Sequence, residues 1–317
     1  MKARPALLCP VDFSEASGIA LRFATRIAEH FGARLVILAV EDPLLTEAVD
    51  VGTGKVWDPD DTRHELARFS AATLGGNPLK TAEVVYEVRV GKPAKEILHV
   101  AQELGCELIV MSTRGLTGMR KMFFGSTTER VLRETTVPVL ATSPDDDGPK
   151  DLEDIRRIVG RVLVPVDFSP ASVHQIQIAR ELAEALDVPL IAAHVVEPVR
   201  SPMVAKLHLP SIDMERRTRA EDALDELLAT LPRRLHPEAL IAFGDPAEEI
   251  TKLARDRKAG LIVIGLHGSP LLGPRMGSVT YRVLSLTPAL VLALPPAGVT
   301  LRPAMAADPA GERAAAE

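Results

Sequence analysis

Two aspartates are the first residues of this chain whose type and position favour ligand chemistry. Asp12 and Asp167 each follow a short apolar run that ends in Pro-Val, and each precedes Phe-Ser. A carboxylate at the end of a buried strand can accept a hydrogen bond from a ligand amine or hydroxyl. It can equally cap the helix that follows. The residues by themselves leave both interpretations open.

Two glycine loops are the second candidate. The first reads Ser-Thr-Arg-Gly, then nine residues, then Gly-Ser, and the second reads Gly-Leu-His-Gly, then eight residues, then Gly-Ser. Glycines let backbone amides approach an anion, and the free N–H groups of a helix start attract phosphate. The alternative is that the glycines only form turns and the serine caps a helix. The repetition favours phosphate, and the residues concerned are Ser112, Gly115, Gly125 and Ser126, then Gly265, Gly268, Gly277 and Ser278.

These features belong to an internal repeat. Val-Asp-Phe-Ser, Gly-x-Pro-Ala-x-Glu-Ile and the Gly-Ser pair occur twice in the same order, displaced by 155, 153 and 152 residues. Three landmarks in one order indicate a tandem duplication, so each half is a complete domain. We predict domains at 1–145 and 159–296, an exposed linker at 146–158 and a disordered tail at 297–317.

The elements that must position these residues alternate between strand and helix. This alternation predicts an α/β fold: in each half a doubly wound, five-stranded parallel sheet covered by helices on both faces. Ligands of such sheets bind beyond the carboxyl ends of the strands. The segment 41–60 has no sustained period and is predicted as a long loop that covers a site as a lid. The predicted strands are 6–11, 34–40, 82–90, 108–112 and 138–142, then 161–166, 189–195, 239–243, 261–265 and 289–294.

Composition excludes several classes of protein. A formal net charge of -6 and a pI near 5.8 give no basic footprint for nucleic acid. Cys9 and Cys106 lie in apolar runs, where they are expected to be core residues rather than a disulfide framework. No stretch has the length of a signal peptide or membrane span. We therefore expect a cytoplasmic protein that binds neither nucleic acid nor membrane.

Catalytic and metal motifs are missing from the sequence. The histidines have no metal-ligand spacing, and no CxxC or HExxH motif occurs. No GxxxxGK[ST] loop supplies the lysine that assists phosphoryl transfer. Ser14 and Ser169 lie beside the aspartates without a general base near by in sequence, so we interpret them as helix caps. These observations predict no catalytic and no metal-binding residues.

The order Pro-Val-Asp-Phe-Ser, Gly-x-Pro-Ala-x-x-Ile and Gly-x-x-Gly with a later Gly-Ser resembles the universal stress protein family in a tandem form. The resemblance covers 6–142 and 161–294. It implies a flavodoxin-like (adenine nucleotide alpha hydrolase-like) fold that binds ATP, with Mg²⁺ accompanying the nucleotide. By the same resemblance the strand-end aspartate meets the adenine, the glycine loop holds ribose and phosphates, and the backbones of Val40 and Val195 line the adenine pocket.

Each half departs from the family pattern at one point. The first half has Ser112 in place of the first motif glycine, which is tolerated if that position needs no positive φ. The second half has a loop one residue shorter, and Pro270 and Pro274 remove two amide donors from it. We expect the first half to be the better site.

The leading functional hypothesis is an ATP-binding regulatory protein of the stress response, without enzymatic activity. Two alternatives stay open: a nucleotide-free interaction module with degenerate glycine loops, and a slow ATPase. Its partners are expected to be an adenine nucleotide and proteins that the sequence does not identify. The resemblance also implies that the two halves pair through their last strands, 138–142 and 289–294, and it leaves a homodimer open.

Overall fold

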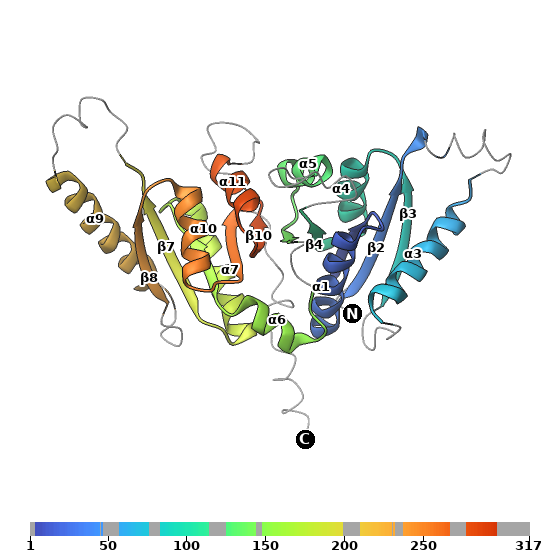
Figure 1. Ribbon diagram of the computed structural model, residues 1–317, viewed down its shortest axis with the longest axis horizontal. Helices are drawn as coiled ribbons and strands as arrows, with labels where there is room; N and C mark the ends of the chain where they lie inside the picture. The colour runs from blue at the N-terminus through green and yellow to red at the C-terminus, as the bar shows by residue number, and fades with distance from the viewer. Residues whose placement is uncertain are drawn as a thin grey trace, which may run out of the picture. The chain divides into compact units, whose positions relative to one another are not determined.

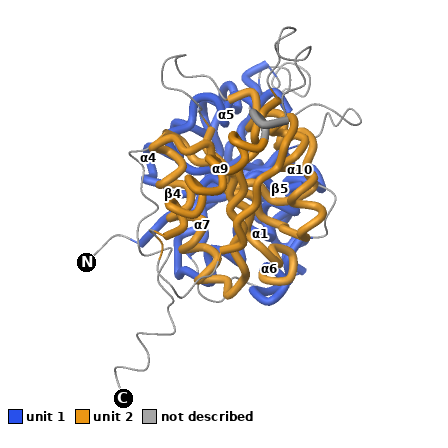
Figure 2. The backbone as a smooth tube through the Cα atoms, turned by 90° about the vertical axis from the view of Figure 1, so that its left-hand side faces the viewer, with its two compact units in different colours: residues 1–155, 299–317 blue, residues 156–298 orange. Residues whose placement is uncertain are grey.

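The chain folds into two compact units, seen in a computed structural model. Unit 1 comprises Met1–Ile155 with Val299–Glu317, and unit 2 comprises Arg156–Gly298 (Figure 2). The structure describes residues 4–44, 46, 57–75, 83–113, 125–143, 148–198, 210–229, 231, 237–266 and 277–296. Most of the predicted lid loop and the whole predicted tail lie outside these residues.

Unit 1 is built on a parallel sheet whose strands run in the order β3-β2-β1-β4-β5. The predicted doubly wound α/β fold is therefore confirmed. The order is that of the first five strands of a dinucleotide-binding sheet rather than the 2-1-3-4-5 order of flavodoxin itself. The strands are β1 (Ala6–Val11), β2 (Arg34–Glu41), β3 (Val84–Val90), β4 (Cys106–Ser112) and β5 (Val139–Thr142).

Helices cover both faces of this sheet (Figure 1). α1 and α3 contact each other over β1, β2 and β3, whereas α4 and α5 contact each other on the opposite face. Right-handed crossovers cause this division, because the chain moves from β1 outward to β3 and then returns to β4 and β5. The helices are α1 (Glu15–Phe31), α3 (Pro59–Thr73), α4 (Pro93–Glu103) and α5 (Ser126–Glu134).

The ends of α1 follow from its sequence. Ser14 is the N-cap, and its hydroxyl accepts a hydrogen bond from the Ser17 backbone N–H. Gly32 ends the helix at φ 57°, a left-handed conformation that glycine adopts without steric cost. Both ends agree with the prediction from the residues.

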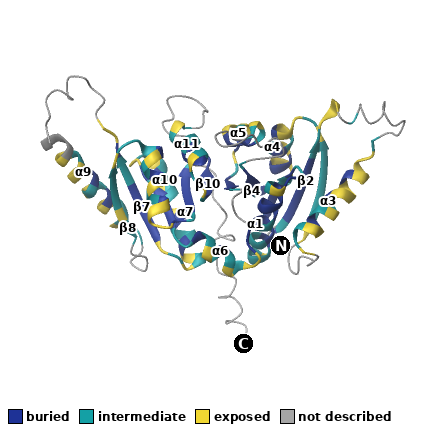
Figure 3. Cartoon of the chain, viewed as in Figure 1, coloured by how far each residue is buried: buried dark blue, intermediate teal, exposed yellow. Residues whose placement is uncertain are grey.

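The core of unit 1 is formed by the central strands, drawn in dark blue in Figure 3. Leu7, Leu8 and Cys9 of β1 are fully buried, as is Ile109 of β4. Burial raises the pKa of the Cys9 thiol well above its usual range and that of Cys106 to about 11, the latter opposed by Arg34. Both cysteines are free, buried thiols, so their predicted role as core residues is confirmed.

Unit 2 repeats the same winding, with its strands in the order β10-β9-β6-β7-β8. α7 contacts β6, β7 and β9, and α9 contacts β7 and β8, whereas α10 and α11 contact each other. The strands are β6 (Val162–Pro165), β7 (Leu190–Val196), β8 (Glu238–Phe243), β9 (Leu261–Gly265) and β10 (Leu290–Leu294). The helices are α7 (Pro170–Leu186), α9 (Pro210–Ala229), α10 (Pro246–Asp256) and α11 (Ser278–Leu286).

Between the two repeats the chain forms a helix, α6 (Leu152–Val159), inside the segment expected to be an exposed linker. Its Ile155 and Val159 are buried, and Asp154 accepts a hydrogen bond from the Lys150 backbone at 2.9 Å. Gly148 and Pro149 before the helix are buried as well, so the described part of this segment is not the exposed linker that its composition predicts. The predicted pairing of the last strands of the halves concerns the placement of the units and stays a prediction.

The N-caps of α1 and α7 provide a matched test of capping. Ser14 caps its helix through its hydroxyl, whereas Ser169 makes no side-chain cap hydrogen bond. Both hydroxyls also bond to the neighbouring aspartate, so the cap hydrogen bond is a clear difference between the two serines. We expect Ser14→Ala to lower the free energy of unfolding by about 1 kcal/mol more than Ser169→Ala, measured by urea denaturation. Equal losses in the two variants would contradict this assignment.

Candidate ligand-binding sites at the winding reversals

The carboxyl ends of β1 and β4 form the point where the winding of unit 1 reverses. β1 and β4 are neighbours, but the chain leaves them toward opposite edges of the sheet. A crevice opens at such a point, since no crossover connection covers it. β2 continues past the last β1–β2 pair, Val11 with Ala39, and brings Val40 to the same end of the sheet.

Asp12 lies directly after β1 and is held by the first turn of α1. The chain turns at Phe13, which has a left-handed φ of 61°. The Asp12 Oδ1 accepts hydrogen bonds from the Ser14 backbone N–H at 3.1 Å and from the Ser14 hydroxyl at 2.5 Å. Ser14, not Asp12, caps the helix, and Asp12 orients the capping side chain. Asp12 is therefore not the N-cap of α1, and the alternative in which it caps this helix is wrong.

The start of α5 forms the other wall. The Gly125 N–H donates to the Thr113 carbonyl at 3.1 Å, and the Thr128 hydroxyl donates to the Ser112 carbonyl at 3.0 Å. These two bonds attach the helix start to the end of β4. Gly125 is the N-cap and has no side chain to cap with, while Ser126 is the first helical residue. The alternative in which the serine caps the helix is therefore wrong, and no side chain caps the first-turn amides of α5.

A cavity of about 300 Å³ lies between these walls. It is lined by five of the six residues that the sequence nominated in the first half, and the sixth, Gly115, lies outside the described residues. The five come from four separate places in the chain, and they are Asp12, Val40, Ser112, Gly125 and Ser126. The volume is at the lower end of the range for small-molecule sites.

The cavity also has lining residues that the sequence analysis did not nominate. Leu38, Ile97 and Met111 give it apolar surface, and Thr127 and Thr128 add hydroxyls next to Ser126. Pro93 and Ile97 belong to the repeated Gly-x-Pro-Ala-x-Glu-Ile segment, so the repeat itself contained the signal. Nothing in the sequence marks Met111 as part of a site, since it is one of several apolar residues in β4.

The backbone conformation at Ser112 explains why a serine is tolerated there in place of the motif glycine. Among the described residues with positive φ, neither Ser112 nor its counterpart Gly265 occurs. Gly125 likewise has a φ of -58°, and a Cβ there would meet only the Thr128 hydroxyl at 3.9 Å. Gly125 thus leaves space for a close approach rather than permits an unusual backbone.

Unit 2 has the same scaffold at the ends of β6 and β9. The Gly277 N–H donates to the Leu266 carbonyl at 2.8 Å, and the Thr280 hydroxyl donates to the Gly265 carbonyl at 2.7 Å. Ser278 begins α11 after the N-cap Gly277. Asp167 follows β6, and Val195 lies near the end of β7. Of the residues nominated in this half, Gly268 lies outside the described residues.

Asp167 is held differently from Asp12. Its Oδ1 accepts hydrogen bonds from the Ser169 backbone N–H at 3.0 Å and from the Ser172 hydroxyl at 2.7 Å. In unit 1 the matching hydroxyl of Ser17 donates instead to the Ser14 carbonyl at 2.9 Å. Partial burial raises the pKa of the Asp167 carboxyl, but the hydrogen bonds from the two serines outweigh it, and the pKa is lowered overall.

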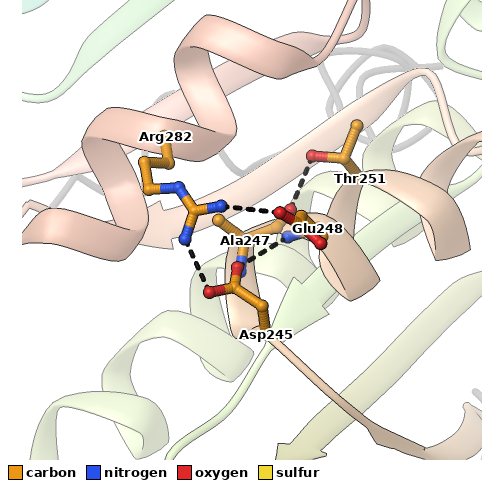
Figure 4. A network of polar contacts seen from close by, with 5 residues as sticks. All are labelled: Asp245, Ala247, Glu248, Thr251 and Arg282. Carbon is orange, nitrogen blue, oxygen red and sulfur yellow. Dashed lines mark hydrogen bonds and ion pairs between the residues drawn. The ribbon is translucent and has the colours of Figure 1, made fainter.

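Across α10 and α11, unit 2 carries an ion-pair network (Figure 4). The Arg282 guanidinium donates to Asp245 Oδ2 at 2.6 Å and to Glu248 Oε1 at 3.0 Å. Asp245 is also the N-cap of α10 and accepts from the Ala247 and Glu248 backbone N–H groups. The hydrogen bond from Arg282 is the main cause that lowers the pKa of Asp245.

In the described part of the chain, no group of three or more His, Cys, Asp or Glu side chains is arranged to hold a metal ion. Among the same residues, no helix combines the length and apolar character that crossing a membrane requires.

Fold and sites together define a tandem doubly wound α/β protein with a ligand-sized cavity at a winding reversal. The model of the Universal stress protein family matches residues 5–143 and 159–295, so the chain belongs to this family and has its tandem form. Universal stress protein YxiE of Bacillus subtilis is 33% identical over 142 residues, which are 42% of this chain and 95% of that relative. A universal stress protein of Mycolicibacterium smegmatis is 26% identical over 297 residues, 90% of this chain and 96% of the relative.

Solved structures agree in fold. A universal stress protein from Archaeoglobus fulgidus superposes with a TM-score of 0.61 at 23% identity, covering 92% of this chain and 98% of its own. A functionally unknown protein from Pseudomonas aeruginosa superposes with a TM-score of 0.64 at 20% identity, covering 99% and 98%. At these identities the likeness concerns the fold alone.

The serine contacts of Asp167 predict a pH effect. Because its folded pKa is depressed, the carboxylate contributes stability above its unfolded pKa, about 3.9, that is lost as pH falls through the folded value. We expect Ser172→Ala to raise the pKa of Asp167, measured by NMR titration, and to move acid unfolding of unit 2 to higher pH. Ser285→Ala, whose hydroxyl bonds only to the Tyr281 carbonyl within α11, is the control. An unchanged Asp167 titration in Ser172→Ala would refute the assignment.

Proposed function

We propose that the protein binds ATP, accompanied by Mg²⁺, in the cavity of unit 1 and acts as a nucleotide-responsive regulator in the stress response rather than as an enzyme. The observation that carries this proposal is the convergence of Asp12, Val40, Ser112, Gly125 and Ser126 on one cavity. We also propose a cytoplasmic location, in keeping with two buried, free cysteines.

The chemistry of the cavity fits the parts of an adenine nucleotide. Leu38, Ile97 and Met111 offer apolar contact to a purine ring. The Asp12 carboxylate is an acceptor for an exocyclic amine or a ribose hydroxyl. At the α5 end, the first-turn N–H groups and the Ser126 hydroxyl are donors for phosphate oxygens, and the helix dipole favours negative charge there.

Magnesium would be held mainly by the nucleotide. Mg²⁺ prefers oxygen ligands and is commonly bound by phosphates with one or two protein groups. The hydroxyls of Ser126 and Thr127 are such oxygens, and both line the cavity. When bound, the ion neutralises phosphate charge.

A regulatory role follows from what the cavity offers to a bound nucleotide. Its polar groups are acceptors and donors suited to binding, and the sequence has no phosphate-binding lysine loop for phosphoryl transfer. A ligand that binds one conformation more tightly than another shifts the population toward it. Nucleotide binding at the ends of β1 and β4 would in this way change a surface that partner proteins recognise.

Nucleotide extraction and calorimetric titration test the site. Protein purified without added nucleotide is expected to bind ATP in unit 1, with affinity reduced roughly tenfold or more, about 1.4 kcal/mol, by Gly125→Val with Ser126→Ala. The valine fits the backbone of Gly125 but fills ligand space. The matched control is Gly277→Val with Ser278→Ala in unit 2, which leaves the unit 1 site intact.

Two outcomes would count against the proposal. If wild-type protein binds no adenine nucleotide, the chain is an interaction module with an inherited fold. If ATP is turned over rapidly and the turnover is abolished by a single substitution in the site, the protein is an enzyme and the regulatory role is wrong.

A further inference from the structure

The two units differ in charge where α4 and α10 begin. The first position is the N-cap, occupied by Lys92 in unit 1 and Asp245 in unit 2. The second lies three residues later and is Lys95 or Glu248. We call these two the rim positions. They carry +2 in unit 1 and -2 in unit 2, a difference of four charges, +2 - (-2) = 4, between two otherwise similar scaffolds.

In unit 1 the first rim position is next to a residue of the cavity. Lys92 directly precedes Pro93, which lines the cavity and is exposed to solvent. Lys95 takes the place of Glu248, whose carboxylate reaches Arg282 on the neighbouring helix. Both lysines are exposed, and α4 packs against α5. At low salt the charges of such residues are screened only weakly, so they add to the field that an anionic ligand of the cavity meets.

An arginine common to both units shows the effect of the rim charge. In unit 2, Arg282 of α11 turns to α10 and bonds to Asp245 and Glu248 (Figure 4). In unit 1 the residues that correspond to Asp245 and Glu248 are Lys92 and Lys95, and the matching Arg130 pairs with Glu134 of its own helix at 3.0 Å. The same residue type thus adopts different partners because the sign of the rim charge is reversed.

The unit 2 network carries a net negative charge. Asp245 and Glu248 supply two carboxylates and Arg282, in the middle of α11, supplies one compensating cation, which leaves a net charge of -1 on these three residues. The side chains are partly exposed, 42% for Arg282 and 21% for Asp245, so the pair is solvated and contributes little to stability. Its effect is on the field that an approaching anion meets.

Resting on the proposed function, we infer that Lys92 and Lys95 are anion-selecting residues of the unit 1 site, and that Asp245 and Glu248 exclude polyphosphates from the matching end of unit 2. The chain then binds one nucleotide, and the second unit is a copy of the scaffold with the opposite charge selectivity.

Charge reversal tests this inference on the full chain, with ATP and uncharged adenosine as probes in calorimetric titration. Lys92→Asp with Lys95→Glu is expected to weaken ATP roughly tenfold at low salt, with the loss shrinking at about 0.5 M salt, and to leave adenosine within about twofold. The control, Arg217→Asp with Arg219→Glu, makes the same charge change on exposed residues of α9 and is expected to leave ATP affinity unchanged.

The matching experiment in unit 2 is Asp245→Lys with Glu248→Lys, which is expected to raise the stoichiometry from one ATP per chain to two.

The outcomes separate this inference from the proposed function. Two ATP per wild-type chain, or equal losses for ATP and adenosine in the unit 1 reversal, would overturn the inference and leave nucleotide binding standing. A stoichiometry that stays at one in a folded unit 2 reversal would show that the acidic pair does not cause the exclusion. If that variant loses helix content, the adenosine comparison in unit 1 decides. No binding of either probe by the wild type refutes the proposed function, and the inference falls with it.

Discussion

The handedness of the crossovers between parallel strands is the constraint on which this protein depends. Because each crossover is right-handed, outward winding from β1 to β3 and return winding to β5 place their helices on opposite faces. This leaves the carboxyl ends of β1 and β4 uncovered, and the cavity of unit 1 lies there. The strand order thus determines where the cavity lies, and the side chains determine what it binds.

Short hydrogen-bonded connections then fix the two walls of this crevice. Asp12 is held through the cap of α1, and the start of α5 is tied to β4 by Thr128. In unit 2 the backbone bond recurs from Ser169 to Asp167, and the hydroxyl of Thr280 ties the start of α11 to β9. Both walls are therefore preorganised by bonds that do not involve a ligand, which lowers the cost of ordering when one binds.

The duplication allows each unit to act as a control for the other. Backbone geometry at the helix starts is nearly the same, with φ of -58° at both Gly125 and Gly277. One difference is the sign of the charge at the N-terminal ends of α4 and α10, at side chains that are partly or fully exposed. A duplicated domain can change such residues without loss of fold, since most surface substitutions cost little stability.

The sequence by itself determined the repeat, the fold class and most elements, because these depend on local periodicity and turn chemistry. The strand 6–11, the helix start at Ser14 and its end at Gly32 were all predictable from neighbouring residues. So was the position of Asp12, Gly125 and Ser126, which line the cavity, since each is adjacent to the end of an element. The helix Leu152–Val159 was not, because an acidic, proline-containing start suggested a linker. Only the tertiary structure brought Met111 into the cavity and Asp245 to Arg282, 37 residues away. These relations depend on which strands become neighbours and on how two helices pack, and no local pattern in the chain encodes either.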